Sequence, residues 1–161
     1  TESGTFVVDN GANSFTPLLG YLVENSGISF LQENGKKVYL HGLIGGGDTY
    51  ASTKTGFIDL VTNSDAPVIL WINEHFGEVV SESGVQFLES DDFKKNVKSL
   101  CGAVKLHKRN PHTYGEDIKK MTRARQTFGQ VMESPDYTIM EKQRLRLFAT
   151  DVFNQLQKIK F

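Results

Sequence analysis

Six residues in the middle of the chain, Pro67 to Ile72 (PVILWI), decide the fold class. The run does not alternate between apolar and polar positions, so a strand formed by it is apolar on both faces. Strands buried on both faces are typical of parallel sheets that carry helices on either side. The stretch therefore predicts an α/β protein with a largely parallel central sheet.

Extended and helical patterns alternate on both sides of this strand. The sequence predicts further strands at residues 6–8, 37–44 and 102–106. Apolar residues at helical spacing predict helices that begin near Asn13 or Ser14, at Asp48, at Ser90, at Thr113, and near Ser134 or Thr138. Strands that alternate with helices give a three-layer α/β domain, and we interpret residues 1–161 as a single domain.

Composition favours a water-soluble globular protein. Of the 161 residues, 39% are hydrophobic and 23% are charged, and no apolar run has the length of a membrane span. The single cysteine, Cys101, cannot form a disulfide within the chain. We therefore expect a cytoplasmic protein.

Charge is distributed unevenly along the chain. Residues 1–93 hold 3 Lys or Arg and 13 Asp or Glu, a net charge of −10, whereas residues 94–161 hold 15 and 6, a net charge of +9. The candidate DNA-binding cations are Lys105, Lys108, Arg109, Lys119, Lys120, Arg123 and Arg125. The same cations could instead form solvated helix faces that pair with acidic residues, and the sequence leaves both interpretations open.

Three predicted strand ends carry candidate ligand-binding residues, because ligands of parallel sheets gather at the carboxyl ends of the strands. These ends are Asp9-Asn10-Gly11, Ile44-Gly45-Gly46-Gly47 and Asn73-Glu74-His75. An Asp that closes a strand suits Mg²⁺ held through water, although such an Asp can also cap the next helix. Neither G-x-x-x-x-G-K-[ST] nor G-x-G-x-x-G occurs in the sequence, so a phosphate-binding loop is missing.

Four longer stretches resemble one family. They are residues 6–25 (FVVDNGANSFTPLLGYLVEN), 38–57 (VYLHGLIGGGDTYASTKTGF), 67–79 (PVILWINEHFGEV) and 127–148 (TFGQVMESPDYTIMEKQRLRLF). Together they resemble the C-terminal two-thirds of the StbB/TraL/MobD-type ATPases, which are ParA/MinD-like proteins of conjugative and mobilisable plasmids of bacteria. The resemblance implies a P-loop NTPase fold that lacks its N-terminal βα unit, so the chain would be the C-terminal portion of a longer NTPase.

The resemblance also implies roles for individual residues. Asp9 would support Mg²⁺ through water and activate the attacking water, and Asn10-Gly11 would be the switch turn near the terminal phosphate. Asn73 would read the adenine edge, although a strand-end Asn can also bond its local backbone. ATP and Mg²⁺ are expected for the longer parent. Without the phosphate loop we expect this chain alone neither to bind ATP tightly nor to hydrolyse it.

The implied function is a portion of an ATPase that acts in plasmid conjugative transfer, mobilisation or stability. The implied partners of the parent are a second copy of itself and plasmid DNA or transfer proteins. An alternative is a non-enzymatic accessory module that binds DNA or a relaxosome component through the basic C-terminal half. An enzyme that acts on a small molecule at Gly45–Gly47 is a further alternative, but the sequence shows no nucleophile paired with a general base. The four histidines do not have the spacing of a metal site.

Apolar residues at helical spacing form a stripe along the predicted last helix, near the C-terminus. Relatives of the MinD type touch membranes with a terminal amphipathic helix. We favour packing against the sheet for this stripe, which is the ordinary fate of an apolar helix face. Its residues are Leu145, Phe148, Val152, Leu156 and Ile159.

Overall fold

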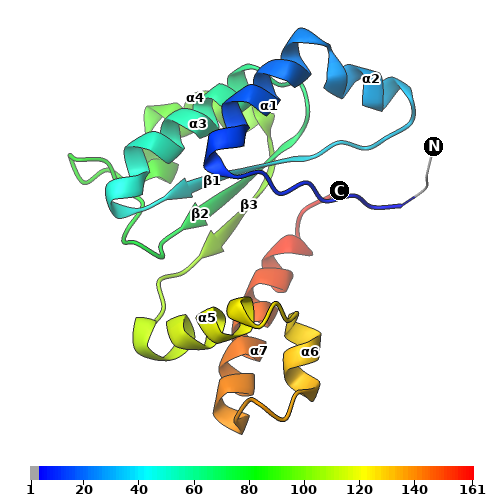
Figure 1. The fold of residues 1–161 in the computed structure, drawn as a ribbon. Helices are drawn as coiled ribbons and strands as arrows, with labels where there is room; N and C mark the ends of the chain where they lie inside the picture. Colours follow the sequence, from blue (N-terminus) through cyan, green and yellow to red (C-terminus); the bar gives the residue numbers. More distant parts are fainter. Residues whose placement is uncertain (1–3) are drawn as a thin grey trace.

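A three-stranded parallel sheet forms the centre of the structure, a computed structural model that describes residues 4–161 apart from the side chain of Ala12. The strands are β1 (Leu40–Gly45), β2 (Val68–Asn73) and β3 (Leu100–Leu106), in the order β1-β2-β3 (Figure 1). Both neighbouring pairs are parallel. The prediction of a parallel sheet centred on Val68–Ile72 is therefore confirmed.

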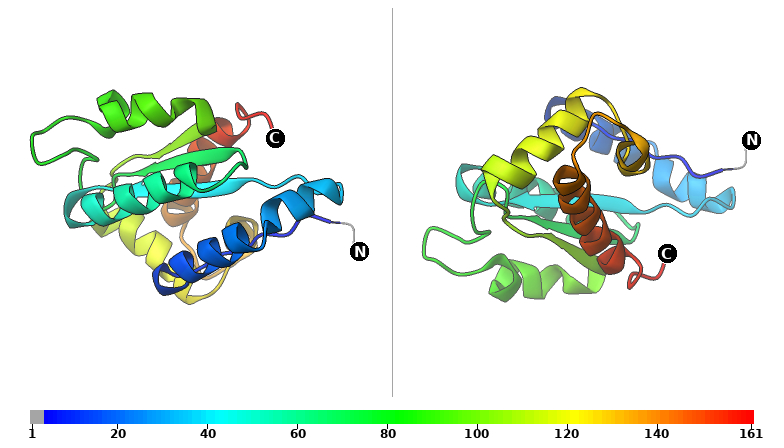
Figure 2. Two further views of the ribbon diagram at one scale, coloured as in Figure 1. Left: turned by 90° about the horizontal axis from the view of Figure 1, so that it is seen from above. Right: turned by 90° about the horizontal axis from the view of Figure 1, so that it is seen from below.

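Helices cover both faces of this sheet. In Figure 1, α1, α3 and α4 lie above the strands and α5, α6 and α7 lie below them, and Figure 2 shows the same layers from above and below. The helices are α1 (Ala12–Glu24), α2 (Gly27–Glu33), α3 (Tyr50–Thr62), α4 (Asp91–Asn96), α5 (Glu116–Arg123), α6 (Phe128–Glu133) and α7 (Ile139–Leu156). Four short helical turns accompany them: η1 (Gly47–Thr49), η2 (Phe87–Glu89), η3 (Val97–Ser99) and η4 (Pro111–Gly115).

The side chains of β2 alternate between two cores. The core on one face joins β1, β2 and α3 and includes Ile44, Phe57, Leu60, Val61, Val68, Leu70 and Ile72. The core on the other face joins β2, β3 and the C-terminal half of α7 and includes Ile69, Trp71, Val104, Val152, Leu156 and Ile159. The sheet is thus the middle of three layers, as the sequence predicted.

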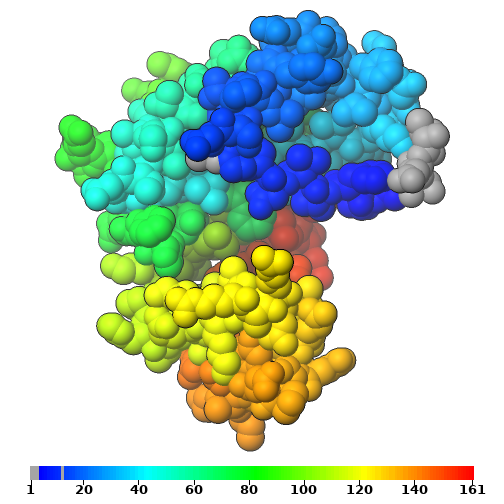
Figure 3. All heavy atoms as spheres, viewed as in Figure 1, coloured from blue at the N-terminus to red at the C-terminus, as the bar shows by residue number. Residues whose placement is uncertain are grey.

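The helices α5, α6 and α7 enclose a third core of their own. It contains Met121, Val131, Tyr137 and Leu145, and these helices form the lower lobe in Figure 3. The Arg144 guanidinium donates to both oxygens of Asp117, at 2.5 and 3.0 Å, and so ties α7 to α5. Because α7 contributes to this core and to the core on the sheet, it connects the two parts of the molecule.

The predicted strand at residues 6–8 is wrong. Phe6, Val7 and Val8 form no strand, and their side chains are 66, 89 and 77% exposed. In Figure 1 this segment runs beside the sheet, below α1, without joining it. A strand is stable only when a neighbour completes its hydrogen bonds and its apolar side chains are covered. Among the residues that the structure describes, no strand pairs with these three.

Several predicted boundaries also shift. β1 begins at Leu40 and β3 at Leu100. Asp48 lies inside the turn η1 and does not cap α3. α2 was not predicted at all, because its seven residues are too few to show a clear helical period.

The helix predicted from Thr113 to Phe128 is interrupted. Arg125 adopts a left-handed conformation with φ of 53°, which ends α5, and Thr127 then caps α6. The capping boxes actually formed start at Thr127 and at Thr138. The second of these confirms one of the two predicted starts of the last helix, whereas no capping box is formed at the predicted start Thr113.

The apolar stripe of α7 packs inward. Leu145 is fully buried in the third core, and Val152 and Leu156 pack beneath the sheet. Among the residues that the structure describes, no helix combines the length and apolarity needed to cross a membrane.

Truncating Leu145 tests the contribution of the third core. Leu145→Ala should lower the free energy of unfolding by about 2–5 kcal/mol, because it leaves a cavity at a fully buried position. Leu147→Ala, two residues further along α7, is the matched control; its side chain is 48% exposed, and we expect a change within about 0.5 kcal/mol. Urea denaturation measures both, and equal effects would contradict the observed packing.

Glu141 makes the start of α7 sensitive to acid. Hydrogen bonds from the Lys120 ammonium and from the Thr138 backbone N–H lower the pKa of Glu141 from 4.5 to about 2. A carboxyl group with a lowered folded-state pKa stabilises the fold above its ordinary pKa, and this stabilisation is lost as the pH falls from about 4.5 towards 2.

The melting temperature as a function of pH tests this effect. The wild-type protein should lose more stability than Glu141→Gln between pH 4.5 and 2. Glu133→Gln is the control, because Glu133 forms no salt bridge with residues 4–161. Parallel curves for the wild type and Glu141→Gln would show that the Lys120 contact contributes nothing.

Candidate functional site

The carboxyl ends of the three strands meet at one edge of the sheet. Gly45, Asn73 and Leu106 are neighbours in the strand register, with Asn73 in the middle. The ladder continues one step beyond them, since the Gly46 N–H donates to the Asn73 carbonyl and the Glu74 N–H donates to the Leu106 carbonyl, each at 3.0 Å. This is the edge at which parallel sheets bind ligands.

A groove of about 480 Å³ opens beside Asn73. Its walls come from the carboxyl edge of the sheet, the segment that follows β3, α5 and one residue of α7. The lining residues are Asn73, His75, Leu106, His107, Lys108, Arg109, Pro111, Tyr114, Gly115, Ile118, Lys119, Thr122, Arg123 and Phe148. The lining contains aromatic and aliphatic side chains with several cations and no Asp or Glu among the described residues. Such a groove suits a ligand with an apolar planar body and a negative or acceptor group.

Asn73 lines this groove but already makes one local contact. Its Oδ1 accepts a hydrogen bond from the His75 backbone N–H at 3.0 Å. This is the local backbone contact that the sequence left open as an alternative. The Nδ2 donors have no partner within residues 4–161, so they are available to an acceptor in the groove.

Asp9 is not brought to this groove. Asp9, Asn10 and Gly11 are all exposed, and none of the three lines the groove. The Gly11 carbonyl accepts hydrogen bonds from the backbone N–H and the hydroxyl of Ser14, and Gly11 is the N-cap residue of α1. The proposed Mg²⁺ and switch roles of this turn remain predictions.

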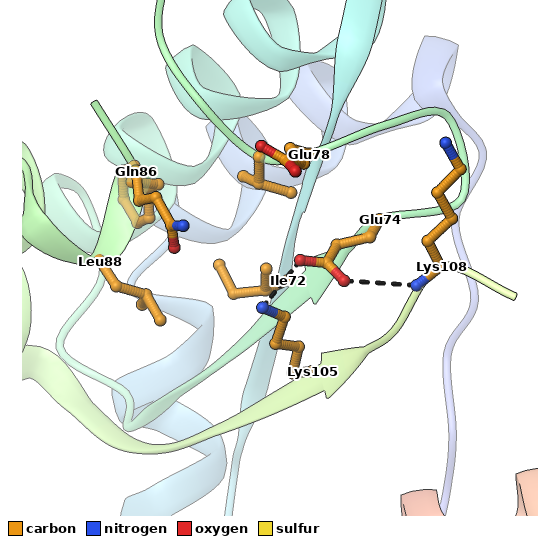
Figure 4. A pocket seen from close by; sticks show the side chains of 9 residues that line it. Ile72, Glu74, Glu78, Gln86, Leu88, Lys105 and Lys108 are labelled. Atoms are coloured by element: carbon orange, nitrogen blue, oxygen red, sulfur yellow. Dashed lines mark hydrogen bonds and ion pairs between the residues drawn. The ribbon is translucent and has the colours of Figure 1, made fainter. Parts of the chain in front are cut away.

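Glu74 belongs to a strand end that the sequence indicated, although the sequence indicated no role for this residue itself. It lines a smaller cavity of about 270 Å³ on the opposite face of the sheet, shown in Figure 4. The Lys105 ammonium lies 2.7 Å from its carboxylate, and the Lys108 N–H donates to it at 3.3 Å. Burial by itself raises the pKa of Glu74, but these hydrogen bonds and the charges of Lys105 and His107 outweigh it, so the pKa is lowered.

Most of the predicted DNA-binding cations have acidic partners. Lys105 pairs with Glu74, Arg109 with Asp151, Lys119 with Glu116 and Lys120 with Glu141, at 2.7 to 2.8 Å. Of the seven candidates, Lys108, Arg123 and Arg125 form no salt bridge with residues 4–161. A DNA-binding surface would therefore depend mainly on these three residues, and it remains a prediction.

The glycine loop after β1 is explained by close backbone packing. A Cβ atom on Gly46 would lie 2.0 Å from the Gly77 carbonyl oxygen, and one on Gly47 would lie 2.7 Å from the Phe76 carbonyl oxygen. Gly47 also has a φ of 58°, which glycine adopts at little cost. The loop thus lies against the segment after β2. This close packing explains why glycine occupies positions 46 and 47, without a bound phosphate.

Histidines and Cys101 form no metal site in the described part of the chain. No three His, Cys, Asp or Glu side chains gather there in a way that could hold a metal ion. His41 instead accepts a hydrogen bond from the Trp71 indole N–H at 2.9 Å, and burial lowers its pKa. Cys101 donates its thiol to the Val68 carbonyl at 3.5 Å.

The fold and this edge define an α/β protein with a parallel sheet and a ligand-sized groove at its carboxyl ends. The chain is homologous to two Escherichia coli proteins, each named Protein TraL. It is 32% identical to one over 152 residues, which cover 93% of this chain and 63% of the relative. It is 31% identical to the other over 159 residues, which cover 98% of this chain and 66% of the relative.

The chain therefore spans slightly less than two thirds of the length of these relatives. No family model matches the sequence, and no solved structure matches it. The homology to TraL proteins is consistent with the resemblance drawn from the four sequence stretches. It does not test the ATPase nature of the resembling family or the residue roles that the resemblance implies.

Substituting Gly46 tests the packing of the glycine loop. Gly46→Ala should cost about 3 kcal/mol or more of unfolding free energy, because the added methyl group meets backbone that cannot move aside without disturbing β1 and β2. Gly20→Ala in α1 is the matched control: nothing lies within 4 Å of the new methyl group, and we expect a gain of about 0.5–1 kcal/mol. Chemical denaturation of both variants measures the difference, and a neutral Gly46→Ala would contradict the observed loop contact.

Proposed function

We propose that the chain acts in plasmid conjugative transfer as the nucleotide-base-binding portion of a ParA/MinD-like ATPase. The observation that carries this proposal is the homology to TraL proteins over 93 to 98% of the chain. The parallel sheet and the groove at its carboxyl edge support it, because nucleotide-binding α/β proteins hold their ligands at this edge.

The groove beside Asn73 fits the base of ATP. Its apolar walls suit a planar ring, and the Nδ2 donors of Asn73 can reach a ring acceptor while Oδ1 keeps its contact with His75. The cations around the groove suit the negative charge of a nucleotide. Asn73 and the groove walls would orient the base and exclude water from its faces.

Residues 4–161 offer no matching site for the phosphates of ATP. The sequence has no phosphate-binding loop with its lysine, and the glycine loop after β1 is filled by the backbone of Phe76 and Gly77. Asp9 would serve Mg²⁺ through water in the parent, with Asn10-Gly11 beside the terminal phosphate. Phosphate binding and hydrolysis would thus require residues outside this chain, and this chain alone would not hydrolyse ATP.

The second candidate is a non-enzymatic module that binds DNA or a transfer protein through the basic C-terminal half. It rests on Lys108, Arg123 and Arg125, which form no salt bridge with residues 4–161. Salt bridges already occupy the other candidate cations, so few phosphate contacts remain to be made. We therefore place this function second.

Titration calorimetry with ATP and Mg²⁺ tests the proposal on the product of the native gene and on this 161-residue chain. The native product should bind ATP, whereas this chain should show neither tight binding nor hydrolysis. Asn73→Ala in the native product should weaken binding about five- to tenfold, which corresponds to one lost hydrogen bond. The same substitution should reduce the frequency of plasmid transfer between cells.

Asn63→Ala is the matched control, because Asn63 bonds only the Asp59 carbonyl at the exposed end of α3. It should leave ATP affinity unchanged. A native product that does not bind ATP, but is retained on DNA in a strongly salt-dependent manner, would reject the ATPase and favour the second candidate.

A further inference from the structure

A hairpin projects from the protein between β2 and α4. It comprises residues 78–89 and forms the loop that extends beyond α3 at the left of Figure 1 and of both views in Figure 2. The Phe87 N–H donates to the Val79 carbonyl at 3.0 Å, and the Ser81 N–H donates to the Val85 carbonyl at 2.9 Å. Val79 and Phe87 are buried in the core beneath α3. This projecting hairpin is therefore anchored at its base and held by its own hydrogen bonds.

The exposed surface of the projecting hairpin is acidic and apolar. Residues 78–89 contain three glutamates and no Lys or Arg. Glu78, Glu82 and Glu89 are exposed, and none of them forms a salt bridge with residues 4–161. Val85 and Leu88 are 43 and 39% exposed. Such a surface repels nucleic acid and acidic lipid, and it suits a cationic protein surface with apolar side chains.

The groove beside Asn73 has the complementary character. Its described lining contains no Asp or Glu, and its cations are Lys108, Arg109, Lys119 and Arg123. Two of these, Lys108 and Arg123, form no salt bridge with residues 4–161. Tyr114 and Ile118 supply apolar wall between the cations. No residue of the projecting hairpin lines the groove of its own chain, so a hairpin in this groove must come from another copy.

We propose that the groove beside Asn73 accepts the projecting hairpin of a second copy of this chain. The Glu82 carboxylate meets the cations of the groove, and Val85 packs on its apolar wall. The contact joins two different surfaces, so two copies can exchange hairpins in a closed dimer, or successive copies can form an open chain. The inference goes beyond the proposed function and does not depend on it. Because both occupants use one groove, a docked hairpin and a bound base exclude each other.

Sedimentation velocity of the 161-residue chain tests the inference. The chain should self-associate at about 50 mM salt and dissociate at about 500 mM salt, because salt screens the charges. Glu82→Lys and Arg123→Glu should each weaken self-association about fivefold or more, since each places like charges at the contact. An equimolar mixture of the two variants should associate again, because the unchanged hairpin of one variant meets the unchanged groove of the other.

Two variants with the same charge changes elsewhere are the controls. Glu24→Lys alters an exposed acid of α1, and Arg146→Glu alters an exposed cation of α7 that does not line the groove. Both should leave self-association within about twofold of the wild type. Thermal unfolding checks that all variants are folded at the temperature of the measurement. Equal weakening by the controls would show a general attraction between charged molecules and would overturn the proposed contact.

A chain that stays monomeric at both salt concentrations overturns the proposal. If such a monomer binds an oligolysine peptide and loses it in Glu82→Lys, the partner of the hairpin is a different cationic protein. If it instead binds DNA, more weakly in Arg123→Glu and more strongly in Glu82→Lys, the groove cations serve nucleic acid.

Adenosine separates this proposal from the proposed function. Dissociation of the assembly by adenosine would support both. An assembly that forms as predicted but does not respond to adenosine would leave the hairpin contact standing and count against the base site.

Discussion

The burial of β2 on both faces is the constraint on which the rest of the structure depends. Val68, Leu70 and Ile69 are fully buried, and they face different cores because side chains alternate along a strand. A strand without a solvent-exposed face needs helices on each side and a strand on each edge. β1 and β3 supply the edges, α3 supplies one cover and α7 supplies the other. The position of Asn73 at the centre of the carboxyl edge follows directly from the position of β2.

The same edge joins the sheet to the helices α5, α6 and α7. The Gln155 carboxamide of α7 bonds both the N–H and the carbonyl of Lys105, at 2.7 and 3.0 Å, and so occupies hydrogen-bonding groups of β3. Asp151 connects Gln155 to Arg109, while the Lys105 ammonium reaches Glu74 on the other face. Residues 105–109 are therefore held from both faces of the sheet. Because this segment forms one wall of the groove beside Asn73, a ligand there would contact the sheet and the helices of the lower lobe together.

The sequence predicted those features that depend on local pattern, and it missed those that depend on pairing between distant residues. The run Val68–Ile72 and the capping box at Thr138 are readable from neighbouring residues alone. Phe6–Val8 has an equally clear strand pattern but no strand to pair with among the described residues, so its pattern could not decide its structure. The ion pair between Glu74 and Lys105 depends on the register of β2 and β3, which shifts between Val68 and Ile69. The ion pair between Arg109 and Asp151 joins residues 42 positions apart, and no sequence pattern indicated it.

Photolabelling tests the central claim, which is that the groove beside Asn73 binds an adenine base. The native gene product would be irradiated with 8-azidoadenosine triphosphate and Mg²⁺, and the labelled peptides would be identified by mass spectrometry. We predict that the label falls on peptides that line the groove, within residues 73–75 and 106–123, and that excess ATP prevents the labelling. Label that falls elsewhere on the chain, or that excess ATP does not reduce, would contradict a base site at this edge of the sheet.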